Sequence, residues 1–197
     1  IDRIDRNFLD SRKHGDDRDI GIVGDESGNF ILGEKDLDLA KRLCKAGSDH
    51  RKFARQIFVS LDITAPIYWW KEYDTYKVGT VANSTSTMHR IHSKKFEAED
   101  FSIERLDDEA KERFMAFIDY LETLRLRFNE TKDKNYWYEI IQMLPSSYNQ
   151  KRTCTFSYEN VYAMIKSRKD HKLDEWRVFC KTLKDELPYF KDMFTEV

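Results

Sequence analysis

The sequence lacks both a charge imbalance and long apolar runs. Its 34 Lys and Arg nearly balance its 36 Asp and Glu, so no whole-protein field would attract nucleic acid or an anionic membrane. The longest apolar runs, such as residues 65–70, fall far short of the roughly 20 residues that a membrane-spanning helix needs. No signal peptide is recognisable either. We therefore expect a cytoplasmic protein that binds neither nucleic acid nor membranes.

Cysteine is also scarce, and the common catalytic motifs are missing. Cys44, Cys154 and Cys180 are widely spaced, with no C-x-x-C and no His at ligand spacing, which argues against a metal site. We expect three reduced, mostly buried thiols and no metal. The sequence contains no G-x-x-x-x-G-K-[ST], G-x-G-x-x-G, H-E-x-x-H or G-x-S-x-G, so it gives no sign of the chemistries that these motifs carry.

Glycine is concentrated at one end of the chain. Five of the seven glycines fall within the first 35 residues, which predicts an arm of loops or a short hairpin over residues 1–35. The remaining residues, 36–197, have the length of one domain. Because 40% of the chain is hydrophobic and 14% aromatic, this domain can bury a substantial core.

Hydrophobic periodicity predicts a mixed α+β domain dominated by helices, with a small sheet. The β-branched run 57–63 and the alternating run 151–158 are typical of strands. Thr64 can cap the helix that follows the first strand, with Pro66 in its first turn. The polar stretch 77–95 loses periodicity and predicts an extended loop. Apolar residues at helical spacing predict helices over residues 36–47, 49–55, 107–129, 159–167 and 173–187, and a shorter one that ends at Leu144-Pro145.

Two segments together carry a family resemblance. The first is the aromatic run 65–73, which leads into the polar stretch Asn83-Ser84-Thr85-Ser86-Thr87-Met88-His89. The second opens at Leu144-Pro145 and closes with Glu175-Trp176-Arg177. In this order the segments resemble the flavin-dependent thymidylate synthases, the ThyX-like or thymidylate synthase complementing proteins. The resemblance covers residues 36–187 and implies that family's fold.

The resemblance also implies cofactors, a substrate and an assembly. Members of the family bind FAD and dUMP between subunits of a homotetramer. They methylate dUMP to dTMP with NADPH as reductant and methylenetetrahydrofolate as carbon donor. In such an enzyme the protein chiefly binds, orients and polarises the reacting groups. A site of this kind needs cations for phosphates and hydrogen-bond donors for the pyrimidine.

The family's signature loop aligns with residues 75–89. It reads Arg-His-Arg, then Ser, Asn-Glu, a second Ser, and Arg-Tyr. With one inserted residue, the matched positions in this chain hold Thr75, Tyr76, Lys77, Asn83, Ser84, Ser86, Met88 and His89. Upstream, Arg55 lies near a family His that contacts flavin. Several charged family residues are therefore replaced by uncharged ones.

The resemblance assigns roles to some of these positions. It implies that FAD would be bound by Arg55, Lys77, Asn83 and His89, and the nucleotide by Ser84 and Ser86. Losing one charge-assisted contact costs about 1.5–3 kcal/mol, roughly tenfold or more in affinity. The loss of these charges would thus weaken the binding of both FAD and the nucleotide unless Arg55, Lys77, His89 or Arg90 compensates. The alternative for residues 83–89 is a surface loop whose polar side chains bond their own backbone.

Further nucleotide contacts are implied near the C-terminus. Lys151 or Arg152 matches a basic residue that meets the dUMP phosphate from a neighbouring subunit, and Arg168 matches a nucleotide-binding Arg. The alternative reading is solvated charge on a strand and at a helix end. His50, His89 and His92 could act in proton transfer, but the sequence shows no carboxylate partner for them, which favours structural roles. Helical spacing already explains Trp69, Trp70, Tyr73, Trp137 and Trp176 as core or subunit contacts.

Three functions remain open from the sequence. The first is an active flavin-dependent thymidylate synthase. The second is a divergent homologue that has lost flavin and serves as a nucleotide-binding or structural oligomer. The third is an enzyme that modifies a different pyrimidine nucleotide, because altered base-recognition residues can mean a new substrate.

Overall fold

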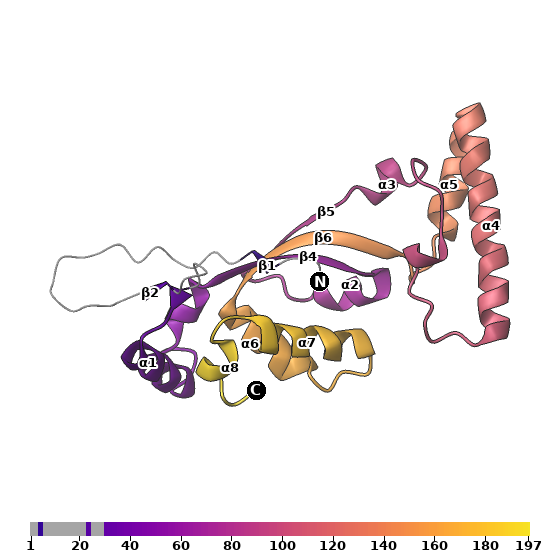
Figure 1. Ribbon diagram of the computed structural model, residues 1–197. Helices are drawn as coiled ribbons and strands as arrows, with labels where there is room; N and C mark the ends of the chain where they lie inside the picture. Colours follow the sequence, from indigo (N-terminus) through magenta and orange to yellow (C-terminus); the bar gives the residue numbers. More distant parts are fainter. Residues whose placement is uncertain (1–3, 6–22, 25–29) are drawn as a thin grey trace. The chain divides into compact units, whose positions relative to one another are not determined.

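The computed structural model describes residues 4–5, 23–24 and 30–197, with side chains from residue 31 onward (Figure 1). Most of the predicted N-terminal arm, residues 1–35, therefore lies outside the described residues. Within it, β2 (Val23–Gly24) and β3 (Phe30–Ile31) pair antiparallel. This pairing agrees with the predicted arm of loops or a short hairpin, and the residues between the two strands lie outside the described part of the chain.

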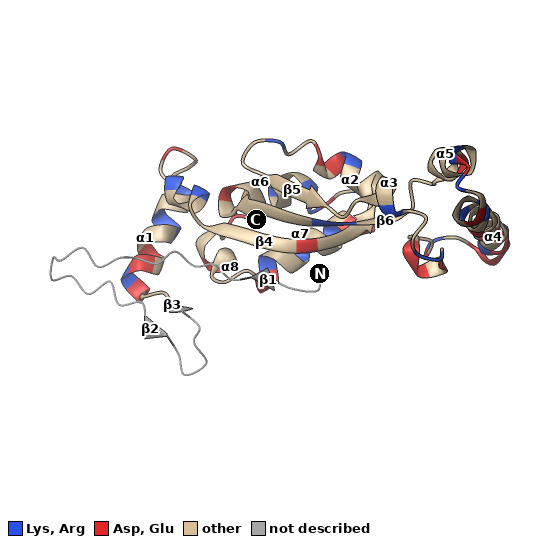
Figure 2. Cartoon of the chain, turned by 90° about the horizontal axis from the view of Figure 1, so that it is seen from above, with Lys and Arg blue, Asp and Glu red and all other residues tan. Residues whose placement is uncertain are grey.

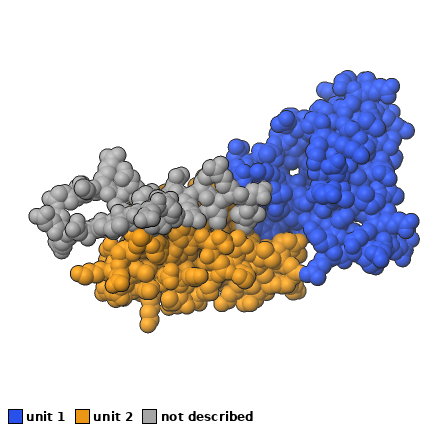
Figure 3. All heavy atoms as spheres, viewed as in Figure 1, with its two compact units in different colours: residues 1–2, 62–75, 82–153 blue, residues 3–61, 76–81, 154–197 orange. Residues whose placement is uncertain are grey.

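The chain divides into two compact units (Figure 3). Unit 1 contains Asp62–Thr75 and Ala82–Thr153, and unit 2 contains Arg3–Leu61, Tyr76–Val81 and Cys154–Val197 apart from the undescribed positions. The chain changes unit inside both of its long strands, β4 (Phe58–Pro66) and β6 (Asn149–Ser157). The units are therefore built from alternating segments of the chain.

A four-stranded sheet has the order β1-β4-β6-β5. Strand β1 (Ile4–Asp5) pairs antiparallel with β4, with Ile4 opposite Leu61. Strand β5 (Val81–Ser84) is the edge strand beside β6, and all four of its residues are exposed. The prediction of an unbroken loop over residues 77–95 is therefore wrong, because this stretch contains β5 and the short helix α3 (Thr87–Arg90).

The start of helix α2 (Ile67–Tyr73) also differs from the prediction. Strand β4 continues through Pro66, which is the N-cap residue of α2 and makes no side-chain cap bond. Two of the first helical N–H groups are satisfied from another segment instead, since Ile67 N donates to Tyr148 O at 3.0 Å and Tyr68 N to Ser146 O at 3.0 Å. A capping role for Thr64 is therefore not needed.

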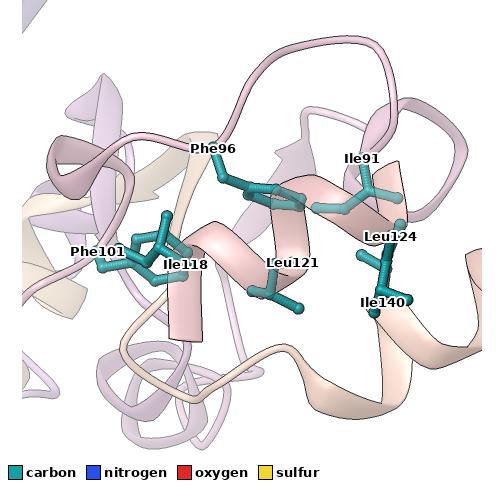
Figure 4. Close-up of a cluster of buried hydrophobic side chains, with 7 residues drawn as sticks. All are labelled: Ile91, Phe96, Phe101, Ile118, Leu121, Leu124 and Ile140. Carbon is teal, nitrogen blue, oxygen red and sulfur yellow. The ribbon is translucent and has the colours of Figure 1, made fainter. Parts of the chain in front are cut away.

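Unit 1 packs a hydrophobic cluster on the helical pair α4 (Asp108–Thr131) and α5 (Lys134–Met143). Asp107 and Asp133 cap the two helices by accepting bonds from Ala110 N and Asn135 N. Buried side chains from these helices meet the segment that precedes α4 (Figure 4), and the cluster comprises Ile91, Phe96, Phe101, Ile118, Leu121, Leu124 and Ile140. The apolar spacing predicted for α4 thus faces a core.

Unit 2 is built mainly from helices. Its helices are α1 (Glu34–Lys45), α6 (Tyr158–Arg168), α7 (Asp174–Glu186) and α8 (Phe190–Met193). Ser157 and Asn160 form a capping box at the start of α6, which satisfies backbone groups that a helix start leaves unpaired. The predicted helix at residues 49–55 is a 3-10 helix, η1, over Lys52–Arg55. The remaining predicted helices and both long strands are confirmed, with shifted ends.

The cysteines and most of the tryptophans are buried, as the sequence predicts. Cys44, Cys154 and Cys180 are buried and form no disulfide. Burial raises the pKa of the Cys44 thiol to about 11 and that of Cys180 to about 12. Trp69, Trp70, Tyr73 and Trp176 are almost fully buried.

Candidate functional site

The signature segment, here residues 83–89 of the signature loop, lies in unit 1 and begins on the edge strand β5. Asn83 and Ser84 are exposed on β5, and Ser86 is exposed just before α3. Thr85 holds this turn to β6, because its backbone N and its Oγ1 both donate to Lys151 O, at 3.0 and 3.1 Å. The residues of the polar stretch are therefore presented to solvent on an anchored backbone.

A pocket of about 160 Å³ opens beside this turn, within unit 1. It combines residues of the signature segment with residues from the loop that follows α3 and from the start of β6. Its polar lining includes Ser86, Thr87, Arg90, Lys95, Tyr148 and Gln150. Of this lining, the sequence assigned nucleotide binding to Ser86 and a compensating charge to Arg90.

Two further lining residues, Lys94 and Asp100, neutralise each other. Lys94 Nζ lies 3.0 Å from Asp100 Oδ1, and this bond raises the pKa of the Lys94 ammonium. Burial, with a smaller contribution from Asp100, raises the pKa of the Tyr148 hydroxyl. Tyr148 therefore keeps its proton at neutral pH and remains a hydrogen-bond donor.

The two adjacent basic residues of β6 each contact a carboxylate. Lys151 Nζ lies 3.0 Å from Asp62 Oδ2 on β4, and both side chains are partly exposed. Arg152 Nη1 donates to Asp74 Oδ1 at 2.7 Å, and its guanidinium lies 4.2 Å from the centroid of the Trp70 ring. Figure 2 shows the basic (blue) stretch of β6 beside β4, which is uncharged except for one acidic (red) patch. Both candidate phosphate ligands are thus already paired within unit 1.

A chain of hydrogen bonds connects Arg152 to the pocket. Arg152 Nε donates to Gln150 Oε1 at 2.8 Å, and Gln150 Nε2 donates to Thr87 Oγ1 at 3.0 Å. Gln150 and Thr87 both line the pocket. The arrangement fixes the orientation of the Gln150 amide, so Arg152 positions one wall of the pocket without lining it.

The predicted site residues of unit 2 have different surroundings. Arg168 Nε donates to the Tyr76 hydroxyl at 3.1 Å, and its guanidinium lies 5.5 Å from the centroid of the Trp176 ring. Lys77 is exposed in the same turn as Tyr76, and Arg55 is exposed with one long bond to Ser48 O at 3.4 Å. Arg168 therefore has aromatic partners, whereas Lys77 and Arg55 present their charges to solvent.

The four residues predicted to bind FAD have exposed polar or cationic side chains. Arg55, Lys77, Asn83 and His89 are all exposed, and their side chains make only the one long Arg55 bond among the interactions of the described residues. Cations and amide donors of this kind suit the phosphates and polar ring atoms of a dinucleotide. In residue type, Arg55 and Lys77 of unit 2 and Asn83 and His89 of unit 1 each suit such contacts.

Sequence reasoning missed most of the polar pocket lining. Arg90 was named only as a compensating charge, and Lys95, Tyr148 and Gln150 were not assigned a site role. The signal that could have found them is the cluster of basic residues that closes the predicted loop, from His89 to Lys95. Among the residues that the structure describes, no group of His, Cys, Asp and Glu could hold a metal ion, and no helix is long and apolar enough to cross a membrane.

Comparison with known proteins identifies the fold. Two solved structures of the flavin-dependent thymidylate synthase ThyX from Helicobacter pylori, both complexed with FAD and dUMP, resemble the chain with TM-scores of 0.61 and 0.62. The chain is 19% and 18% identical to them, and each match covers 83% of both chains. No family model and no curated protein sequence matches the chain.

The chain has an α+β fold like that of ThyX. This confirms the fold class predicted from the order of the two sequence segments. At such low identity the likeness concerns the fold, and the ligands of those structures belong to those proteins. Fold alone does not fix function.

Proposed function

We propose that this chain is a flavin-dependent thymidylate synthase-like protein that binds FAD and a dUMP-like nucleotide. The observation that carries the proposal is the fold likeness over 83% of the chain to two proteins whose structures contain FAD and dUMP. In the active form it would methylate dUMP to dTMP, taking the methylene carbon from methylenetetrahydrofolate and the reducing equivalents from NADPH. Bound flavin would supply the redox chemistry of that transfer.

The residues of this chain would act by binding and orientation. Arg55, Lys77, Asn83 and His89 are proposed to bind the cofactor, and their exposure supports this role. Ser84 and Ser86 are proposed to donate hydrogen bonds to the nucleotide, since both are exposed on either side of Thr85, where β5 ends. A homotetramer belongs to the same proposal. So does the division into an N-terminal arm, residues 1–35, and a synthase-like domain, residues 36–197.

The two proposed phosphate ligands differ in how firmly their surroundings hold them. Lys151 is half-exposed in its pair with Asp62, so an arriving phosphate could exchange for that carboxylate at low cost. Arg152 is held by Asp74, Gln150 and Trp70, and moving it would break all three contacts. We therefore favour Lys151 over Arg152 as the residue that meets the nucleotide phosphate.

A second candidate function has its own support. Arg168 donates to Tyr76 and lies near Trp176, while Thr75 and Met88 stand where the family has Arg. Fewer cations are then available for a dinucleotide that carries two phosphates. The second candidate is therefore a homologue without flavin that binds a mononucleotide.

The visible absorbance spectrum of the purified protein separates these candidates. We expect flavin absorbance that survives desalting after incubation with FAD, together with a rise in melting temperature on adding dUMP, because a ligand that binds only the native state stabilises it. A colourless protein that still responds to dUMP would support the second candidate. Retained flavin with no dUMP response would indicate a different pyrimidine substrate. A protein that responds to neither would contradict the proposal.

A further inference from the structure

The pocket of unit 1 contains two cationic side chains that no described residue neutralises. Arg90 and Lys95 both line it, and neither forms an ion pair or side-chain hydrogen bond within the described part of the chain. Lys95 helps to lower the pKa of Glu122 from a distance, but that carboxylate is already bonded through both oxygens to Arg125, at 2.6 and 2.7 Å. The positive charge of Lys95 is therefore available to a ligand.

The other lining residues add donors and little negative charge. Asp100 is the acidic residue of the lining, and Lys94 balances it at 3.0 Å. The Ser86 hydroxyl has no partner within the described part of the chain, and the Tyr148 hydroxyl stays protonated at neutral pH. The pocket thus carries an excess of positive charge with hydroxyl donors beside it, which is the composition of an anion site.

The pocket is also of a size that selects for a small group. Its volume of about 160 Å³ is below the range of roughly 300–1,000 Å³ typical of sites that enclose a drug-sized ligand. A phosphate group fits a space of this size, whether as the free anion or as the end of a larger molecule that extends into solvent.

The backbone that carries the two cations is held in place. Arg90 directly precedes Ile91 and Lys95 directly precedes Phe96, and both of these apolar residues are buried in the cluster of Figure 4. Glu122 Oε2 accepts a bond from Phe96 N at 3.3 Å, and Arg125 Nη1 donates to His92 O at 3.2 Å. A site on an anchored loop loses less conformational freedom when it binds a ligand.

We infer that this pocket is a phosphate-binding subsite in which Arg90 and Lys95 supply the charge and Ser86 a hydrogen bond. The family resemblance assigns no role to Arg90 or Lys95 beyond a compensating charge at Arg90. The subsite shares Ser86 with the proposed function but does not depend on flavin. In this chain, two cations located after the signature segment supply positive charge that Thr75 and Met88 do not.

The test measures binding of inorganic phosphate to the full chain by calorimetry, at low ionic strength in a buffer without phosphate. Arg90→Gln and Lys95→Gln are each expected to weaken phosphate binding about tenfold or more, as loss of one charge-assisted contact does. Arg90→Lys should recover part of the loss. The matched control is Arg113→Gln, which removes one positive charge from an exposed pair with Glu109 on α4, outside the lining, and should leave affinity unchanged.

Undetectable phosphate binding would overturn the inference, and so would equal affinities in the two Gln variants and the parent. Competition then identifies the source of the phosphate. Displacement of phosphate by dUMP but not by deoxyuridine would show that the pocket holds the phosphate of a nucleotide. If dUMP does not compete while the Gln variants still lose affinity, the pocket is a subsite for the free anion, and the melting shift on adding dUMP tests the proposed nucleotide function separately.

Discussion

The neighbouring residues Lys151 and Arg152 allow a direct test of how their surroundings set their contribution to stability. Both are basic, both belong to β6 and both pair with an aspartate of unit 1. Lys151 and Asp62 keep 43% and 36% of their side-chain surface exposed, whereas Arg152 keeps 18%. We expect Arg152→Met to destabilise the protein far more than Lys151→Met.

The magnitude follows from the contacts of each side chain. Arg152→Met removes the bond to Asp74, leaves Gln150 Oε1 without its donor and loses the guanidinium over Trp70. Because Asp74 is itself half-exposed, we expect a total loss of about 2–4 kcal/mol in the free energy of unfolding. Lys151→Met removes one solvent-screened pair, for which about 1 kcal/mol or less is typical.

Urea unfolding followed by circular dichroism provides the measurement, with both variants and the parent under identical conditions. Arg152→Lys keeps the charge near Asp74 but not the planar fork, and should fall between the parent and Arg152→Met. Equal losses for the two Met variants would refute the reasoning, because they would show that burial and stacking add nothing to the Arg152 pair.

The remaining predictions concern the core, pH and the thiols. Leu124→Ala removes a fully buried side chain from the unit 1 cluster and should cost about 2–5 kcal/mol, measured as a lower unfolding midpoint. The bond from Arg125 lowers the pKa of Glu122 below its ordinary value of 4.5. The stabilising contribution of the ionised Glu122 is therefore present above pH 4.5 and is lost as the pH falls through the lowered pKa. Melting curves of Glu122→Gln should accordingly converge on those of the parent in acid and fall below them at pH 7, and a constant difference would contradict this. Thiol reagents should react slowly at pH 8 with native Cys44 and Cys180, whose pKa values burial raises to about 11 and about 12, and rapidly after unfolding; fast native labelling at either position would be inconsistent with that burial.

Much of the fold could be predicted because its helices follow local periodicity. The apolar spacing of α4 correctly placed Ile118, Leu121 and Leu124 in a core. Strand β5 could not be found in this way, since all of its residues are exposed and its sequence does not alternate. Residues 81–84 form a strand because they pair with β6, and this pairing cannot be predicted from their own sequence.

The candidate site was harder to predict than the fold. The identity of Arg152 as a basic strand residue was readable, but its partner Asp74 lies 78 positions away in the sequence. Whether a basic side chain is available to a ligand depends on such distant carboxylates. The same reasoning separates Lys94, which Asp100 neutralises, from its neighbour Lys95. Only the folded arrangement distinguishes these two adjacent lysines.

The alternation of chain segments between the units limits how the protein can be taken apart. Each unit draws its residues from before and after the other's segments, and the chain changes unit after Leu61, Thr75, Val81 and Thr153. A single proteolytic cut or a terminal truncation therefore cannot release either unit with all of its segments. Producing either unit by itself would therefore require its separate segments to be rejoined by new linkers.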